Sequence, residues 1–132
     1  MENLQAMEIV AWIAVFISLG MALFQLMLAL GAPFGNLAWG GKYKILPLSL
    51  RFGSFISVIL FIIAGISVAE KADIIIILNQ DELVTALVWF FVILFGLSTI
   101  GNITSKSKWE KRIMTPIAFS IFLLCLIIVL GT

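Results

Sequence analysis

The stretch "LGAPFGNLAWGGKYKILP", residues 30–47, interrupts an otherwise apolar chain and decides how the chain is divided. It holds four glycines, two prolines and two lysines, and the sequence on either side is almost wholly apolar. Glycine and proline mark turns, and lysine favours water, so an apolar helix is not expected to continue through this stretch. It therefore predicts a connection between two apolar helices.

The composition of the whole chain predicts that lipid is its main solvent. Of 132 residues, 63% are hydrophobic and 11% are charged, whereas soluble domains are about half apolar and about a quarter charged. The net charge of +1 gives no sign of a nucleic-acid partner. There is no histidine and one cysteine, Cys125. An internal disulfide is therefore impossible, and we expect neither a metal site nor a cofactor.

Four apolar stretches are long enough to cross a bilayer, which takes about 20 residues of helix. They cover about residues 7–30, 47–69, 83–100 and 113–130. Backbone groups must be paired inside hydrocarbon, and four segments are too few for a barrel. The sequence therefore predicts an all-α integral membrane protein with one domain, residues 1–132, in which four transmembrane helices form a bundle.

Several residues mark where these helices are expected to begin. Pro47 and Pro116 fit a first helical turn, and Thr115 is placed to cap the fourth helix. Asn79 followed by Glu82 resembles a capping box for the third helix. The conformation of residues 70–82 stays open, because their short apolar run fits an extension of the second helix, a strand or a separate short helix.

The basic residues predict the orientation in the membrane. Seven of the eight flank the first connection, residues 31–46, or the third connection, residues 101–112, and only Lys71 lies on the opposite side. Connections rich in Lys and Arg face the cytoplasm. We therefore expect both connections to be cytoplasmic and both termini to be outside.

The same two connections resemble each other. "GNLAWGGKYKILP" starts at Gly35, and "GNITSKSKWEKRIMTP", which is three residues longer, starts at Gly101. One interpretation is two repeated helical hairpins, a pattern known in transporters. The other is that loops at a membrane surface reuse the same residue types for turns and anchors. Both interpretations stay open.

Polar residues within or beside the helices define a candidate binding site. Three of them, Gln25, Arg51 and Asn102, are expected to converge in the cytoplasmic half, where Arg51 would attract an anion or a lipid headgroup. The alternative is that these residues hold helices together and that Arg51 reaches the interface. The candidate ligand-binding residues are Gln25, Asn36, Trp39, Arg51, Ser54, Thr99 and Asn102.

Catalytic chemistry is not expected. The nucleotide-binding loop pattern fails at residues 36–43, because Asn36 replaces its first glycine and Tyr43 replaces its Ser or Thr. Nucleophilic catalysis lacks a histidine base. Asp81 and Glu82 are better explained as charges at a helix N-terminus. No carboxylate lies near the expected midplane, which argues against a proton-coupled exporter.

Two strings in the chain resemble a group of small four-span bacterial membrane proteins of unknown function. The strings are "LALGAPFGNLAWGGKYKILPLSLRFGS", residues 28–54, and "GNITSKSKWEKRIMTP", residues 101–116. The group shares a Gly-Ala-Pro-x-Gly…Gly-Gly…Leu-Pro…Leu-Arg string and a later Gly-Asn…Met-Thr-Pro string. The resemblance implies a bacterial cytoplasmic membrane and brings no activity with it.

Two functions therefore stay under consideration. The first is a non-enzymatic membrane protein that binds a lipid or small amphipathic ligand in a cytoplasmic-side cavity, as an accessory or sensor subunit. The second is a small oligomeric transporter or channel. The expected partners are membrane lipid and either a second copy of the chain or a larger membrane complex, but not nucleic acid.

Overall fold

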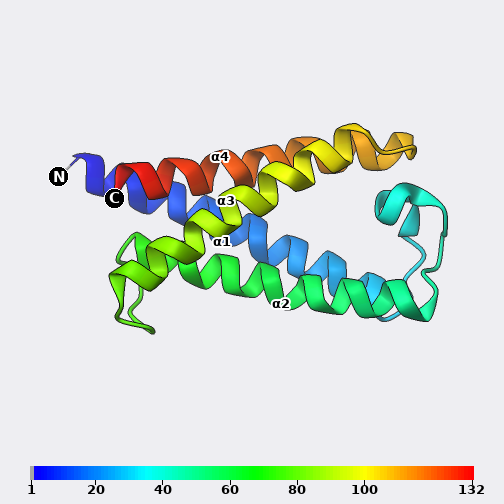
Figure 1. Ribbon diagram of the computed structural model, residues 1–132, viewed down its shortest axis with the longest axis horizontal. Helices are drawn as coiled ribbons and strands as arrows, with labels where there is room; N and C mark the ends of the chain where they lie inside the picture. The colour runs from blue at the N-terminus through cyan, green and yellow to red at the C-terminus, as the bar shows by residue number, and fades with distance from the viewer. Residues whose placement is uncertain (1) are drawn as a thin grey trace.

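The computed structural model describes residues 2–132, which form a bundle of four long helices without strands (Figure 1). The helices are α1 (Glu2–Ala29), α2 (Leu48–Lys71), α3 (Asp81–Ile103) and α4 (Thr115–Gly131). Two 3-10 turns, η1 (Gly35–Leu37) and η2 (Trp39–Gly41), lie in the first connection, and a π-helical turn, η3 (Glu110–Met114), runs directly into α4. The predicted all-α, four-helix fold is confirmed.

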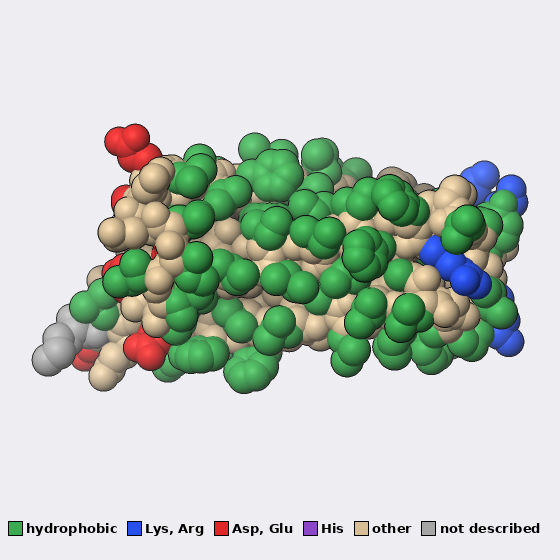
Figure 2. Space-filling view, turned by 90° about the horizontal axis from the view of Figure 1, so that it is seen from below, with side chains coloured by type: hydrophobic (Ala, Val, Ile, Leu, Met, Phe, Trp, Pro, Cys, Tyr) green, Lys and Arg blue, Asp and Glu red, His purple; other side chains and the backbone are tan. Residues whose placement is uncertain are grey.

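The surface of the bundle is apolar along its length. Each of the four helices is long and apolar enough to cross a membrane, if the fourth is counted from Glu110. In each helix, at most 33% of the most apolar 18-residue segment is buried inside the bundle. Large side chains such as Phe16 and Leu48 are 68% and 82% exposed. Figure 2 shows hydrophobic side chains (green) along the length of the bundle, with acidic side chains at one end and basic side chains at the other. An apolar surface of this extent fits lipid rather than water, which supports a multi-pass membrane protein.

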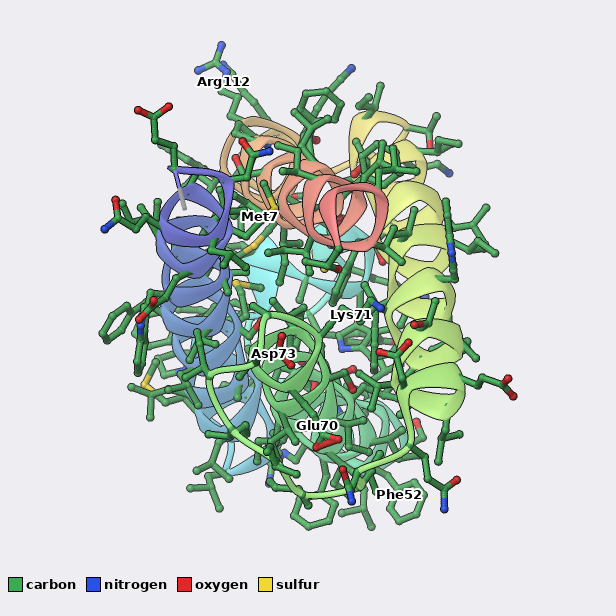
Figure 3. All side chains as sticks on the ribbon, turned by 90° about the vertical axis from the view of Figure 1, so that its left-hand side faces the viewer. Met7, Phe52, Glu70, Lys71, Asp73 and Arg112 are labelled. Carbon is green, nitrogen blue, oxygen red and sulfur yellow. The ribbon has the colours of Figure 1, made fainter. Side chains whose placement is uncertain are left out.

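The helices pack chiefly as two antiparallel hairpins, α1 with α2 and α3 with α4. Helix α3 runs obliquely, close to α2 at Asp81 and close to α4 at its other end (Figures 1 and 3). As a result, α3 diverges from α2 toward the end of the bundle that holds the first and third connections.

Small and aromatic residues fill the core at different places. Ala14 and Ala64 are fully buried, and Ser18 is 1% exposed, so that the backbones of α1 and α2 approach closely. In the centre, Phe95 stacks on Phe61 and on Phe91, with ring centroids 5.6 and 5.7 Å apart. The aromatic rings therefore fill the space between α2 and α3, where α3 has begun to diverge.

The connection between α2 and α3, left open by the sequence, is neither helix nor strand. The Glu70 carboxylate accepts hydrogen bonds from the backbone N–H groups of Ile77, Leu78 and Asn79, at 2.7 to 3.1 Å. Lys71 Nζ lies 3.2 Å from Asp81 Oδ1 across the same connection. The backbone of the segment that follows α2 is therefore held around the Glu70 carboxylate, which lies in the last turn of α2.

Two of the expected helix starts are correct and two are wrong. Pro47 directly precedes α2, and Pro116 lies in the first turn of α4. The capping box is wrong because Asn79 has φ +53° and α3 starts after Gln80, without a side-chain cap. Thr115 does not cap because the π-helical turn already precedes it.

The two similar connections adopt different conformations. Gly35 lies in a loop, where its N–H donates to the carbonyl of Lys44 at 2.8 Å. Gly101, its counterpart in the sequence comparison, lies inside α3. Both hairpins are antiparallel, as a repeat requires, but their connections differ. The repeat of two helical hairpins therefore stays a prediction.

Candidate functional site

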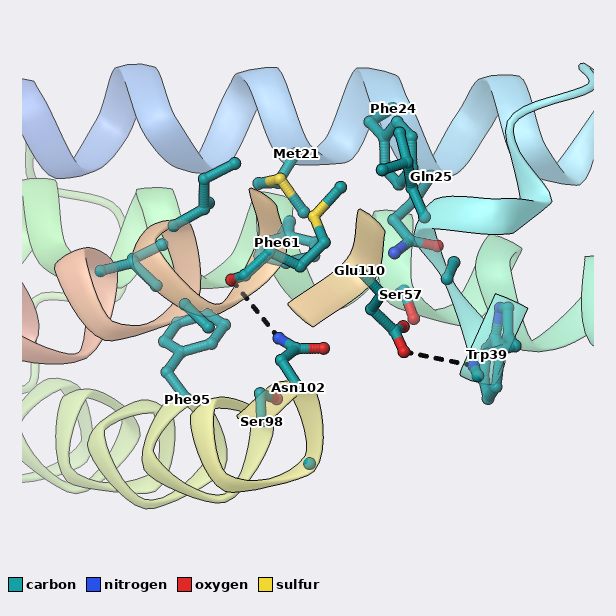
Figure 4. A pocket seen from close by; sticks show the side chains of 18 residues that line it. Met21, Phe24, Gln25, Trp39, Ser57, Phe61, Phe95, Ser98, Asn102 and Glu110 are labelled. Atoms are coloured by element: carbon teal, nitrogen blue, oxygen red, sulfur yellow. Dashed lines mark hydrogen bonds between the residues drawn. The ribbon is translucent and has the colours of Figure 1, made fainter. Parts of the chain in front are cut away.

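A cavity of about 380 Å³ lies between all four helices, at the basic end of the bundle where α3 diverges from α2. Its inner wall is apolar and includes Met21, Phe61, Phe95 and Ile121. Its other end is polar and lies under the first and third connections (Figure 4). One end of the cavity therefore suits hydrocarbon and the other suits a hydrogen-bonding group.

The cavity opens beside α3 through small residues. Ser98 and Gly101 line it and are themselves exposed, and Ser57 lines it from α2. The exposed Ser98 and Gly101 place an opening of the cavity on the α3 side of the bundle, and Trp39 and Gly40, which are also exposed, line it at the first connection.

Trp39 covers the polar end of the cavity from the first connection. Its indole N–H donates to Ser54 Oγ at 3.0 Å, and its ring covers Gly53, where a Cβ would lie 2.9 Å from the ring. Trp39 has φ +53°, which is uncommon for a residue other than glycine. The anchored indole therefore holds the backbone in an unfavourable conformation above the cavity.

Glu110 closes the polar end from the third connection. Its side chain is buried, with the residue only 8% exposed, and its carboxylate accepts hydrogen bonds from the Ser105 hydroxyl and, at 3.3 Å, from the N–H of Gly40. The dashed line near Trp39 in Figure 4 marks the bond to Gly40. Ser107 Oγ donates to the carbonyl of Asn36 and accepts from the N–H of Glu110 at 3.2 Å. These bonds join the two connections.

Two amides add hydrogen-bonding capacity to the cavity. Asn102 Nδ2 lies 3.4 Å from the carbonyl oxygen of Met114, a long hydrogen bond. Gln25 Oε1 is inaccessible to water and has no partner among residues 2–132. Buried polar atoms are usually paired, so the Gln25 oxygen is an exception, while Gln25 as a residue lines the cavity.

Three of the seven residues predicted from sequence line the cavity: Gln25, Trp39 and Asn102. Two others support its cover, since Ser54 holds the Trp39 indole and the carbonyl of Asn36 binds Ser107.

Arg51 and Thr99 serve local structure instead. The Nε of Arg51 donates to the carbonyl of Leu46 at 2.9 Å, and its guanidinium lies against Gly31. The hydroxyl of Thr99 donates to the carbonyl of Phe95 at 2.8 Å. The expected convergence of Arg51 with Gln25 and Asn102 is therefore not observed, because the first connection occupies its guanidinium.

Sequence reasoning missed Glu110 because it lies among lysines in a stretch typical of a solvated loop. A signal was present, however. Glu110, Met114, Ala118, Ile121 and Cys125 recur at three- and four-residue spacing, and all five are buried. Extending the buried face of the fourth helix backwards would have placed Glu110 on it.

The site holds no evident metal centre: within residues 2–132, no three His, Cys, Asp or Glu side chains lie close enough to share an ion. No family model, curated protein or solved structure matches the chain. The class that the fold and cavity define is a polytopic α-helical membrane protein with a cavity between its helices.

Proposed function

We propose that the protein is a non-enzymatic membrane protein that binds a lipid or small amphipathic molecule in this cavity, as an accessory or sensor subunit. The observation that carries the proposal is the division of the cavity into an apolar inner wall and a polar end. Phe61 and Phe95 would contact the hydrocarbon part of the ligand. Gln25, Asn102 and Glu110 would contact its head group.

The size and opening of the cavity support the same function. Small-molecule sites are mostly apolar clefts of about 300–1,000 Å³ with a few placed polar groups, and this cavity of about 380 Å³ lies within that range. The exposed Ser98 and Gly101 lie at its lateral opening. An amphiphile would therefore enter from the membrane with its head group near the surface.

The ligand would enter from the cytoplasmic leaflet if the charge bias sets the orientation. Lys and Arg cluster at the end with the first and third connections, while the termini lie at the other end (Figures 1 and 2). Fusions of reporter domains to each terminus are expected to be active only when the reporter works outside the cytoplasm. A cytoplasmic C-terminus would contradict this orientation.

Filling the mouth of the cavity tests the proposed function. Substitution of Ser98 by Phe is expected to reduce, at least about tenfold, the amount of amphiphile that co-purifies with the protein, because an aromatic ring at this position occupies the opening. Native mass spectrometry from mild detergent measures the retained molecule.

Ser120→Phe is the matched control for this experiment. Ser120 is exposed on α4 and does not line the cavity, so the same change there is expected to leave retention unaltered. Equal retention by both variants and the unmodified protein would contradict the proposal, as would the absence of any retained molecule.

A further inference from the structure

We infer that the cavity selects amphiphiles whose head group is cationic, an amine or ammonium joined to a hydrocarbon chain. This inference rests on the proposed function and names the ligand class. It reverses the sign of charge expected from the sequence, in which Arg51 would attract an anion. The juxtaposition that carries it is the Glu110 carboxylate and the Trp39 ring at the polar end of a cavity whose inner wall is apolar.

The charged residues that line the cavity determine which head-group charge it favours. Glu110 is the one charged residue among the described residues that line it. Arg51, the basic residue closest in sequence to the lining residues of α2, is bound to the first connection instead. A negative head group would therefore meet a like charge, and a positive head group would meet an opposite one.

The hydrogen bonds of Glu110 leave its charge without a counter-charge. Its partners, the Ser105 hydroxyl and the Gly40 N–H, are neutral. In residues 2–132 the one ion pair within 4.0 Å joins Lys71 and Asp81, at the opposite end of the bundle. Burying a carboxylate is costly unless it is paired. A cationic head group in the cavity would supply the missing pair.

The other groups at the polar end also suit an ammonium. A primary ammonium carries three N–H donors and no acceptor. Glu110 offers a carboxylate, the strongest hydrogen-bond acceptor among the residues that line this end of the cavity. The ring of Trp39 lines the cavity at this end as well, and aromatic faces attract cations.

Basic residues at the same end of the bundle do not reverse this selection. Lys106, Lys108, Lys111 and Arg112 are exposed and do not line the cavity. Charges in water are screened over about 8–10 Å at physiological salt, whereas a buried pair in contact is screened much less. The contact with Glu110 therefore outweighs the exposed lysines once a ligand is bound.

The test compares three amphiphiles that share a ten-carbon chain: decylammonium, decanol and decanoate. Binding of each radiolabelled compound is measured at neutral pH on the protein in phosphatidylcholine nanodiscs, with the signal from empty nanodiscs subtracted. We expect decylammonium to bind about tenfold or more tightly than the other two, the range of a buried charge-assisted contact.

Glu110→Gln is expected to remove the preference. Glutamine keeps the shape and the acceptor for Gly40 but not the charge, so decylammonium binding falls about tenfold while decanol binding is unchanged. Glu82→Gln is the matched control, because Glu82 is an exposed carboxylate at the start of α3, away from the cavity. It is expected to leave the binding of all three compounds unchanged.

The outcomes separate this inference from the proposed function. Equal binding of the three compounds to the unmodified protein overturns cation selection and leaves amphiphile binding in place. Preferred binding of decanoate also overturns it. Failure of all three compounds to bind overturns cation selection, and the proposed function then stands or falls on the molecule retained by the unmodified protein and lost from Ser98→Phe. Because the three compounds are compared on the unmodified protein, cation selection is tested even if Glu110→Gln fails to fold.

Discussion

Substitution of Gly35 by Ala is expected to destabilise the protein by about 1–3 kcal/mol, the range typical of overpacking, and toward its upper end because the site cannot relax. Gly35 is buried in the first connection, and a Cβ there would overlap the backbone carbonyl oxygens of Tyr43 and Lys44. These atoms cannot move away without breaking the bond from the Gly35 N–H to Lys44. Unfolding of the detergent-solubilised protein in denaturant measures the change.

Gly20→Ala is the control for this prediction. Gly20 lies in α1, and no described atom lies within 4 Å of the position that a Cβ would take. Alanine is the better helix former by about 1 kcal/mol, so the control is expected to be neutral or slightly stabilising. Equal stability of the two variants would show that the first connection is not closed around Gly35.

Substitution of Phe91 by Ala is expected to destabilise the bundle by about 3–5 kcal/mol, the loss typical of removing a buried aromatic ring. Phe91 is 1% exposed, stacks on Phe95 and meets the edge of Phe90, with centroids 5.7 and 5.1 Å apart. Its removal leaves a void where α3 packs on the core. The same denaturant titration in detergent measures the loss.

Phe52→Ala is the matched control, because this ring on α2 is 67% exposed on the apolar surface. Its loss is expected to change the free energy of unfolding by no more than about 0.5–1 kcal/mol. A control variant as unstable as Phe91→Ala would mean that the packing of α3 on the core does not determine stability.

The helices could be predicted because their signal is local. Four apolar stretches are separated by residues that favour turns or water, and the observed bounds differ from the expected ones by five residues at most. Pro47 and Pro116 also restrict the backbone locally. Length and hydropathy thus determine where helices occur, without any knowledge of which helices touch.

The cavity could not be predicted because it results from how the helices pack. The oblique course of α3 separates it from α2 at one end, and no single stretch records that angle. Gln25, Trp39 and Asn102 were found because polar residues beside apolar helices are few. Glu110 was missed because its burial depends on the meeting of the first and third connections, at Gly40 and Ser107.

The connection after α2 shows the same limit on a smaller scale. Residues 74–78 are apolar and fit several conformations in isolation. Their conformation is determined by the Glu70 carboxylate, which accepts three successive backbone N–H groups from residues 77–79. A single side chain several residues away thus selects one loop structure, and short-range propensity does not reveal it.

Photolabelling would locate an amphiphile bound in the cavity. A decylamine analogue with a diazirine near the end of its chain is added to the protein in nanodiscs, irradiated, and located by peptide mass spectrometry. We expect labels on the inner wall, at Phe61, Phe95 and Ile121, which excess unlabelled decylamine removes. Labels confined to lipid-facing residues such as Phe16 and Phe52, and insensitive to the competitor, would contradict this expectation.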